Sequence, residues 1–158
     1  MKLTTFTDYS LRVLIYLAAR PAQRATIAQV AADFDISEHH LVKVAHFLGQ
    51  KGWLKNVRGK GGGLELALRP QDIGVGQVVR ETEGHAPVAD CFGESGGDCC
   101  IAPACRLRGV LQEAVAAFQA VLDRYTVADL VSNRQQLAQM LFSERPIAMV
   151  RATSQVSP

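Results

Sequence analysis

Apolar residues recur at helical spacing from the beginning of the chain. A first helix is predicted over Asp8–Arg20, where leucine, isoleucine and alanine form one face, with Thr7 or Asp8 as its N-cap and a proline after its last residue. A second helix is predicted from about Thr26, and the acidic and aromatic run at residues 33–36 breaks it. The chain therefore opens with two helices separated by a short connection.

A third helix is predicted over Glu38–Gln50, with Ser37 as its N-cap. Its predicted buried stripe consists of Leu41, Val44, Ala45 and Leu48. Two short helices joined by a brief turn, the second with a polar outer face, are typical of a helix-turn-helix. The residues off the stripe that are candidates for contact with bases in a major groove are Ser37, His39, His40 and Lys43.

A β-hairpin is predicted directly after the third helix. Trp53 and Leu54, followed by Asn56 and Val57, lead into the glycine-rich run at 59–63, and alternation follows at 64–68. Arg58 and Lys60 would lie at the tip of this wing, where they are candidates for contact with DNA. A phosphate-binding loop is the weaker interpretation, because the run lacks the Gly-Lys-Ser/Thr ending and no helix follows it.

The longest periodic element lies near the C-terminus. Apolar residues keep a three-four spacing from Leu107 to Tyr125, over five helical turns. A long amphipathic helix outside a small winged-helix body must bury its stripe, and a partner subunit is the economical answer, so a homodimer is expected. The alternative is that this stripe packs against the chain's own body.

These elements predict a mainly α fold: a winged helix-turn-helix domain with a two-stranded wing, plus a long C-terminal dimerisation helix. The expected divisions are a DNA-binding domain over residues 1–83 and a cysteine-rich loop over 84–106. The dimerisation helix and a further helical segment follow over 107–142, and a disordered tail over 143–158.

The composition indicates a folded domain, and its charge distribution is compatible with either a polyanion partner or an ordinary solvated basic face. The chain has 158 residues, of which 48% are apolar and 20% charged, so global disorder is excluded. Residues 1–70 carry a net charge of +5 and residues 71–158 a net charge of −3. A basic N-terminal half suggests nucleic acid. No stretch is apolar enough to span a membrane and no secretory signal is visible, so we expect a cytoplasmic protein without a membrane partner.

All four cysteines fall in one short polar, glycine-rich segment, at Cys91, Cys99, Cys100 and Cys105. In a cytoplasmic protein, clustered thiolates favour a soft metal, either zinc or an iron–sulfur cluster, over structural disulfides. A structural zinc site and a redox switch at the adjacent Cys99–Cys100 pair both stay open. No constellation of catalytic residues is present, so an enzyme is not expected.

Taken together, the sequence resembles the NsrR-type nitric-oxide-sensing repressors, within the winged-helix group of iron–sulfur regulators that includes the IscR type. The resemblance covers about residues 1–142. The stretches that carry it are LTTFTDYSLR at 3–12, VRGKGGG at 57–63, VVRE at 78–81, PACRL at 103–107 and YTVADL at 125–130. It implies a homodimeric repressor that binds double-stranded DNA at a pseudo-palindromic operator, with nitric oxide as the effector.

The resemblance also implies an iron–sulfur cluster and its ligands. Cys99 and Cys105 have the family's five-residue separation, so the implied thiolate ligands are Cys91, Cys99 and Cys105, although Cys100 could replace Cys99. The fourth ligand would be Asp8, from the first helix of the other subunit. A [4Fe–4S] cluster is preferred, and a [2Fe–2S] cluster would use the same thiolates.

One departure bears on the type of cluster. IscR-type proteins use a histidine shortly after the last cysteine, whereas this chain has Arg108 there and no histidine anywhere beyond Cys105. This difference argues against an IscR-type [2Fe–2S] site, which stays an alternative.

Overall fold

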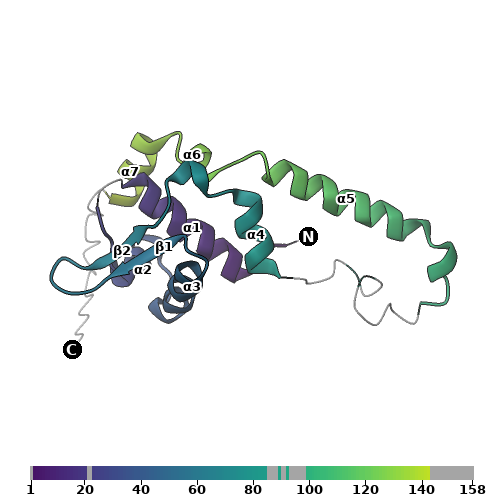
Figure 1. Ribbon diagram of the computed structural model, residues 1–158, viewed down its shortest axis with the longest axis horizontal. Coiled ribbons are helices and arrows are strands. Elements are labelled where there is room, and N and C mark those ends of the chain that lie inside the picture. Colours follow the sequence, from purple (N-terminus) through teal and green to yellow (C-terminus); the bar gives the residue numbers. More distant parts are fainter. Residues whose placement is uncertain (1, 21–22, 85–88, 90–91, 93–98, 143–158) are drawn as a thin grey trace, which may run out of the picture.

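The computed structural model describes most of the chain (Figure 1). The described residues are 2–20, 23–84, 89, 92 and 99–142. The predicted ligand Cys91 and the predicted tail over 143–158 lie outside them. Within the described residues, no helix is both long enough and apolar enough to cross a membrane.

The first helix, α1 (Thr5–Ala19), begins three residues earlier than the sequence pattern predicts. Its N-cap is Thr4, whose hydroxyl accepts a hydrogen bond from the backbone N–H of Thr7 at 3.2 Å. The prediction of Thr7 or Asp8 as the cap was therefore wrong, because Thr4 already satisfies a free N–H group at the helix start. Asp8 consequently lies in the first turn of α1.

The second and third helices form the predicted helix-turn-helix. In α2 (Ile27–Phe34), Thr26 and Gln29 form a capping box, and Asp35 ends the helix in a left-handed conformation with φ of 55°. The helix α3 (Glu38–Gln50) follows, with Ser37 at the N-cap as predicted, but the Ser37 side chain makes no capping hydrogen bond. The turn therefore depends on Asp35.

The wing consists of two antiparallel strands, β1 (Leu54–Val57) and β2 (Gly63–Leu66). A bridge between Ala25 and Leu64 attaches it to the segment before α2. Gly63 has φ of +148°, and a Cβ atom there would lie 2.8 Å from the Ala25 carbonyl oxygen. The close approach of these two backbones thus requires glycine at position 63.

The remaining elements continue the helical fold. They are the short 3-10 helix η1 (Pro70–Asp72), α4 (Val75–Glu83), the 3-10 turn η3 (Ala102–Ala104), α5 (Arg106–Leu122), α6 (Val127–Leu130) and α7 (Arg134–Phe142).

Two backbone hydrogen bonds join the chain before α4 to the chain after α5. The Val75 N–H donates to the Tyr125 carbonyl, and the Val127 N–H donates to the Ile73 carbonyl, both at 2.9 Å. These bonds hold Ile73 in an extended conformation, so α4 begins only at Val75. They also form a neck at the base of the excursion from α4 to α5.

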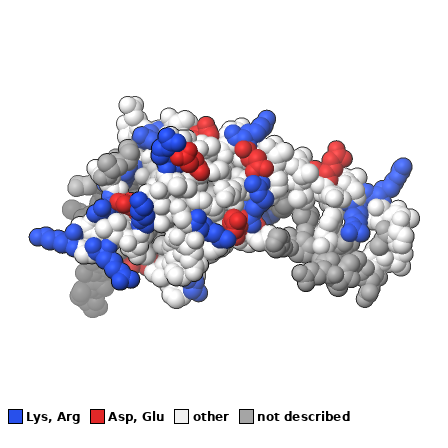
Figure 2. Space-filling model, in the orientation of Figure 1, with Lys and Arg blue, Asp and Glu red and all other residues white. Residues whose placement is uncertain are grey.

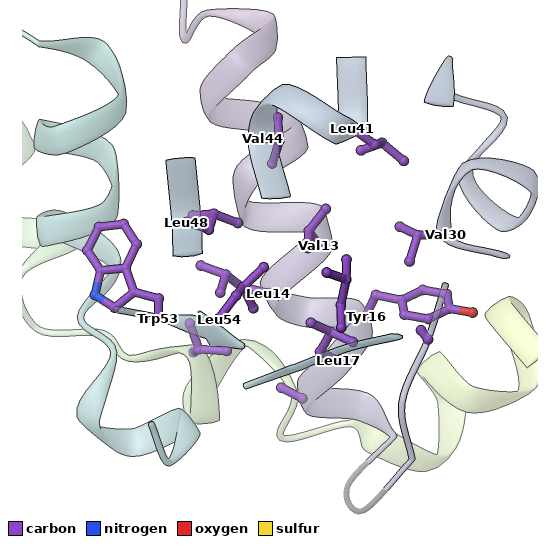
Figure 3. Close-up of a cluster of buried hydrophobic side chains, with 14 of the residues drawn as sticks. Val13, Leu14, Tyr16, Leu17, Val30, Leu41, Val44, Leu48, Trp53 and Leu54 are labelled. Atoms are coloured by element: carbon purple, nitrogen blue, oxygen red, sulfur yellow. The ribbon is translucent and has the colours of Figure 1, made fainter. Parts of the chain in front are cut away.

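The hydrophobic core surrounds α1, whose side chains face those of α3 and β1 (Figure 3). Leu14 and Leu48 are fully buried within it. The Tyr16 hydroxyl, also in the core, donates a 2.6 Å hydrogen bond to Asp33 Oδ2. Burial, followed by the neighbouring Asp33, raises the pKa of Tyr16 to about 12. This contact holds α1 against the end of α2.

The long helix α5 extends away from the body (Figure 1), and none of its residues whose burial is described is buried. Its C-terminal end is attached to α4 by Arg80, whose Nη1 donates to Asp123 Oδ1 at 2.7 Å and to Gln119 Oε1 at 3.3 Å. Leu107 and Val110 are 61% and 60% exposed. The alternative prediction, that the stripe packs against the chain's own body, therefore does not hold for these residues.

Candidate DNA-binding surface and cysteine segment

One face of α3 fixes the helix and the opposite face is open. Leu41, Val44 and Leu48 are at most 2% exposed, so they hold α3 firmly against α1. The predicted contact residues Ser37, His39, His40 and Lys43 are all exposed. A rigid helix with a polar outer face is the arrangement that enters a major groove.

The predicted contact residues do not occupy equivalent places. The His40 ring lies 6.2 Å from the Tyr9 ring of α1 and 6.2 Å from the His39 ring, measured between centroids. His40 therefore lies at the edge of the face that borders α1. Ser37 has no capping bond, so its hydroxyl is not used by the helix.

Val42 is a further exposed residue of α3, at 53%, and it was not among the predicted contact residues. The signal was present in the sequence, because Val42 lies between the stripe residues Leu41 and Val44 and falls off the helical spacing that joins them.

The wing presents two further cations. Arg58 and Lys60 are exposed in the turn between β1 and β2. Basic side chains project at the end of the molecule that holds this turn (Figure 2). Arg24 supports the wing from the side, since its Nε lies 2.9 Å from Glu65 Oε2 and its Nη1 donates to the Gly61 carbonyl at 3.3 Å. The turn is therefore held in place while its own cations are left open.

Cations in the described part of the chain divide into paired and unpaired groups. Those that form ion pairs with carboxylates are Arg12, Arg24, Lys51, Arg69 and Arg80. Lys43, Arg58 and Lys60 take no part in these ion pairs. The positive charge of α3 and the wing is thus available to a polyanion.

Three of the four cysteines are described. Cys99 and Cys100 are exposed, Cys105 is half-buried at the N-cap of α5, and all three are free thiols. Among the described residues, no group of three or more His, Cys, Asp or Glu side chains is placed to hold a metal ion. Within one chain, the structure does not bring Asp8 and these cysteines together as a metal site.

Asp8 has a partner on its own helix. Its Oδ2 lies 2.9 Å from Arg12 Nη2, and its Oδ1 accepts a 3.1 Å hydrogen bond from Arg12 Nε. Both side chains are partly exposed, at 45% and 41%. The Asp8 carboxylate is therefore reachable from outside and held in one orientation by Arg12.

A polar junction joins the start of α1 to the end of α4. Glu83 Oε1 accepts hydrogen bonds from Thr4 N at 2.8 Å, from Thr4 Oγ1 at 3.0 Å, and from the Thr7 hydroxyl. Partial burial acts to raise the pKa of Glu83, but the hydrogen bonds from Thr7 and Thr4 outweigh it and lower that pKa. Asp8 follows Thr7 directly, and the cysteine segment follows Glu83. This junction was not predicted, since no local pattern links residues so far apart in sequence.

The helix-turn-helix, the open face of α3 and the cationic wing define a winged-helix DNA-binding protein. Comparison with known families gives the same class. The chain belongs to the Rrf2 family, whose description is "Iron-dependent Transcriptional regulator" and whose model matches residues 3–133.

Curated relatives cover nearly the whole chain. It is 49% identical over 142 residues to the HTH-type transcriptional regulator NsrR of Bacillus subtilis strain 168, which covers 89% of this chain and 97% of that protein. It is 47% identical over 146 residues to the regulator of the same name from Geobacillus kaustophilus, covering 92% and 99%. The chain is therefore a transcriptional regulator and not an enzyme.

Solved structures confirm the predicted fold class. CymR, described as the global cysteine regulator of B. subtilis, matches with a TM-score of 0.65 at 30% identity, over 84% of this chain and 98% of CymR. The IscR of T. potens matches with a TM-score of 0.68 at 25% identity, over 87% and 90%.

Proposed function

We propose that this chain is a homodimeric repressor that senses nitric oxide through an iron–sulfur cluster and releases DNA when the cluster is nitrosylated. The observation that carries this proposal is the junction of Glu83 with Thr4 and Thr7. It joins the end of α4, after which the cysteine segment begins, to α1, the helix that carries Asp8 and supports α3. The iron dependence in the description of the family agrees with it.

The DNA-binding half of the proposal rests on the open face of α3 and on the wing. In each subunit α3 enters a major groove, and the wing contacts the adjacent minor groove or its phosphates. The proposed contacts are Ser37, His39, His40 and Lys43 on α3 and Arg58 and Lys60 on the wing. Two-fold symmetry then requires a pseudo-palindromic operator with half-sites about one helical turn apart.

The donor set fits an iron–sulfur cluster. Cys99 and Cys105 are free thiols that are reachable from solvent, and thiolates are the ligands that iron–sulfur clusters use. We propose Cys91, Cys99 and Cys105 as ligands, with Asp8 of the partner subunit as the fourth. Cys100 is equally exposed, so it is the substitute for Cys99. A [4Fe–4S] cluster is preferred over a [2Fe–2S] cluster.

When bound, the cluster supplies irons that react with nitric oxide, and the side chains around it supply the connection to DNA. Asp8, which Arg12 holds in one orientation, would supply the bond across the dimer. Thr7, next to Asp8, holds Glu83 at the entrance to the cysteine segment. The Asp8 region and the end of α4, after which the cysteine segment begins, are therefore joined at one point.

The next contact leads from α1 to DNA. Phe6 of α1 packs edge-on against Phe47 of α3, with ring centroids 5.3 Å apart. A shift of the start of α1 thus changes the position of α3. A hundredfold loss of operator affinity requires about 2.7 kcal/mol of difference between the two states. The loss of one cross-subunit ligand bond, together with relaxation of the cysteine segment, would be large enough to supply this free-energy difference.

The dimer half of the proposal rests on α5. Leu107, Val110 and Val121 are exposed on this helix at 46–61%. Exposed apolar residues at helical spacing are costly in water, and a second copy of the same helix would cover them.

The test is made on protein purified without oxygen. We expect about four irons and four sulfides per chain, visible absorption that changes on addition of nitric oxide, and operator binding that the same addition abolishes. Zinc without sulfide would replace the cluster by a structural zinc site. Thiols that oxidise without any metal would indicate a cysteine redox switch. Either result would remove the nitric-oxide mechanism and leave a winged-helix regulator.

A further inference from the structure

Val42 is a large apolar side chain on the surface that the proposed function places in the major groove. It is 53% exposed, whereas the stripe residues Leu41 and Val44 on either side are 2% and 1% exposed. The other exposed large apolar residues of the described chain lie outside α2 and α3; they are Leu68, Ile101, Leu107, Val110, Val121, Tyr125 and Met140. Val42 is thus the apolar residue that the helix-turn-helix presents to its surroundings.

Most neighbours of Val42 on the helix surface are polar. His39 is three residues before it and His46 four residues after it, so both lie on the same side of α3, and Lys43 lies next to them. All three are exposed. The remaining neighbours at helical spacing are the exposed Glu38 and the half-buried Ala45. Val42 is therefore the exposed large apolar side chain on a surface that is otherwise mostly polar.

Neither packing nor helix formation accounts for this valine. Its side chain has no place in the core, and a β-branched residue forms helices less readily than alanine or lysine would at an exposed position. In a major groove, an apolar group on the DNA would give this side chain a contact. The major-groove edge of a base pair offers one, the 5-methyl group of thymine.

We propose that Val42 selects thymine at one position of each operator half-site by packing against the thymine 5-methyl group. The inference rests on the proposed entry of α3 into the major groove. The histidines and Lys43 supply polar contacts to neighbouring bases and phosphates, and Val42 rejects cytosine and uracil, which lack the methyl group. Because the same helix acts in both subunits, the selected thymines are related by the two-fold axis of the operator.

The experiment uses the full-length protein purified without oxygen. Binding duplexes are first selected from a random library, and each thymine of the selected operator is then replaced singly by deoxyuridine, which removes only the methyl group. For the unaltered protein we expect affinity to fall about three- to fivefold at one thymine per half-site, the size expected for losing contact with one methyl group. The Val42→Ala protein should lose this sensitivity at that thymine and keep the pattern elsewhere.

Two further variants give the comparison its controls. Val42→Thr keeps the branched shape and one methyl group, so it should retain the sensitivity to deoxyuridine. Lys43→Gln should weaken operator binding and leave the effect of deoxyuridine at the Val42-dependent thymine unchanged. Identical profiles for the unaltered and Val42→Ala proteins, with both bound to the operator, would overturn this inference alone. Recovery of no duplex at all would overturn the proposed function and this inference with it.

Discussion

Arg12 holds both carboxylate oxygens of Asp8, one turn apart on α1, through contacts of 2.9 and 3.1 Å. A carboxylate that binds a metal must present an oxygen lone pair in the direction of that metal. The contacts with Arg12 use one lone-pair site on each Asp8 oxygen, so a further site on each oxygen is available for the proposed role. Arg12 then sets the direction in which the carboxylate presents these sites.

Asp8→Asn separates this role from a purely structural one. An exposed ion pair within a helix contributes about 0.5 kcal/mol or less, so the stability of the metal-free protein should barely change. The cluster-loaded protein should instead show an altered rate of change in visible absorption on addition of nitric oxide. Asp72→Asn is the matched control, because Asp72 is also held at two points, by Arg69. A normal nitric-oxide response in Asp8→Asn would remove Asp8 from the mechanism.

Glu83→Gln should make folding less stable at neutral pH and less dependent on pH. Since the folded-state pKa of Glu83 is lowered, its carboxylate contributes stability above the ordinary glutamate pKa of about 4.3, and this contribution is lost as the pH falls through the folded-state value. We expect a loss of about 1 kcal/mol at pH 7 in urea unfolding, which diminishes below pH of about 4. Glu81→Gln, which removes a carboxylate of the same helix that is paired with Lys51, is the control. An equal pH profile in both variants would contradict the junction.

Arg58→Ala tests the wing. Removing one phosphate contact should lower affinity for the operator and reduce the slope of log affinity against log salt by about 1. Arg124→Ala, which removes an exposed cation after the end of α5, should leave the slope unchanged. Unchanged operator affinity of Arg58→Ala at moderate salt would show that the wing does not contact DNA.

Two glycine substitutions should have opposite effects on stability. Gly63→Ala places a Cβ 2.8 Å from the Ala25 carbonyl at a φ of +148°, and should cost about 2 kcal/mol. Gly49→Ala, inside α3, places its Cβ where no heavy atom lies within 4 Å, and should add about 0.5 to 1 kcal/mol. Urea unfolding of both variants measures the difference, and equal stabilities would refute the close approach at Gly63.

Val110→Asp tests the proposed dimer surface. A carboxylate in the exposed apolar stripe of α5 would be buried in the dimer interface with no opposite charge beside it. The dimer should therefore dissociate into monomers in sedimentation equilibrium. Gln112→Asp adds the same charge to another side of α5 and should leave the association state unchanged. Dimers that persist in Val110→Asp would place the interface elsewhere.

The helix-turn-helix and wing could be predicted because their information is local. The bounds of α3 follow from its apolar period, and the hairpin follows from strand alternation around glycines. The start of α1 could not be predicted as well, because Thr4, Thr7 and Asp8 are all acceptable N-caps and the choice depends on the contact of Thr4 with Glu83. That contact joins residues 79 positions apart, and no periodic pattern encodes it.

The neck formed by the bonds from Val75 to Tyr125 and from Val127 to Ile73 makes α5 a lever. These bonds join the chain before α4 to the chain after α5. A displacement of the N-terminal end of α5 therefore acts on the body as a rotation about these bonds rather than as a translation. The 17 residues of α5 span about 25 Å. A movement of about 4 Å at Cys105, the N-cap of α5, therefore corresponds to a rotation of only about 10° at the neck.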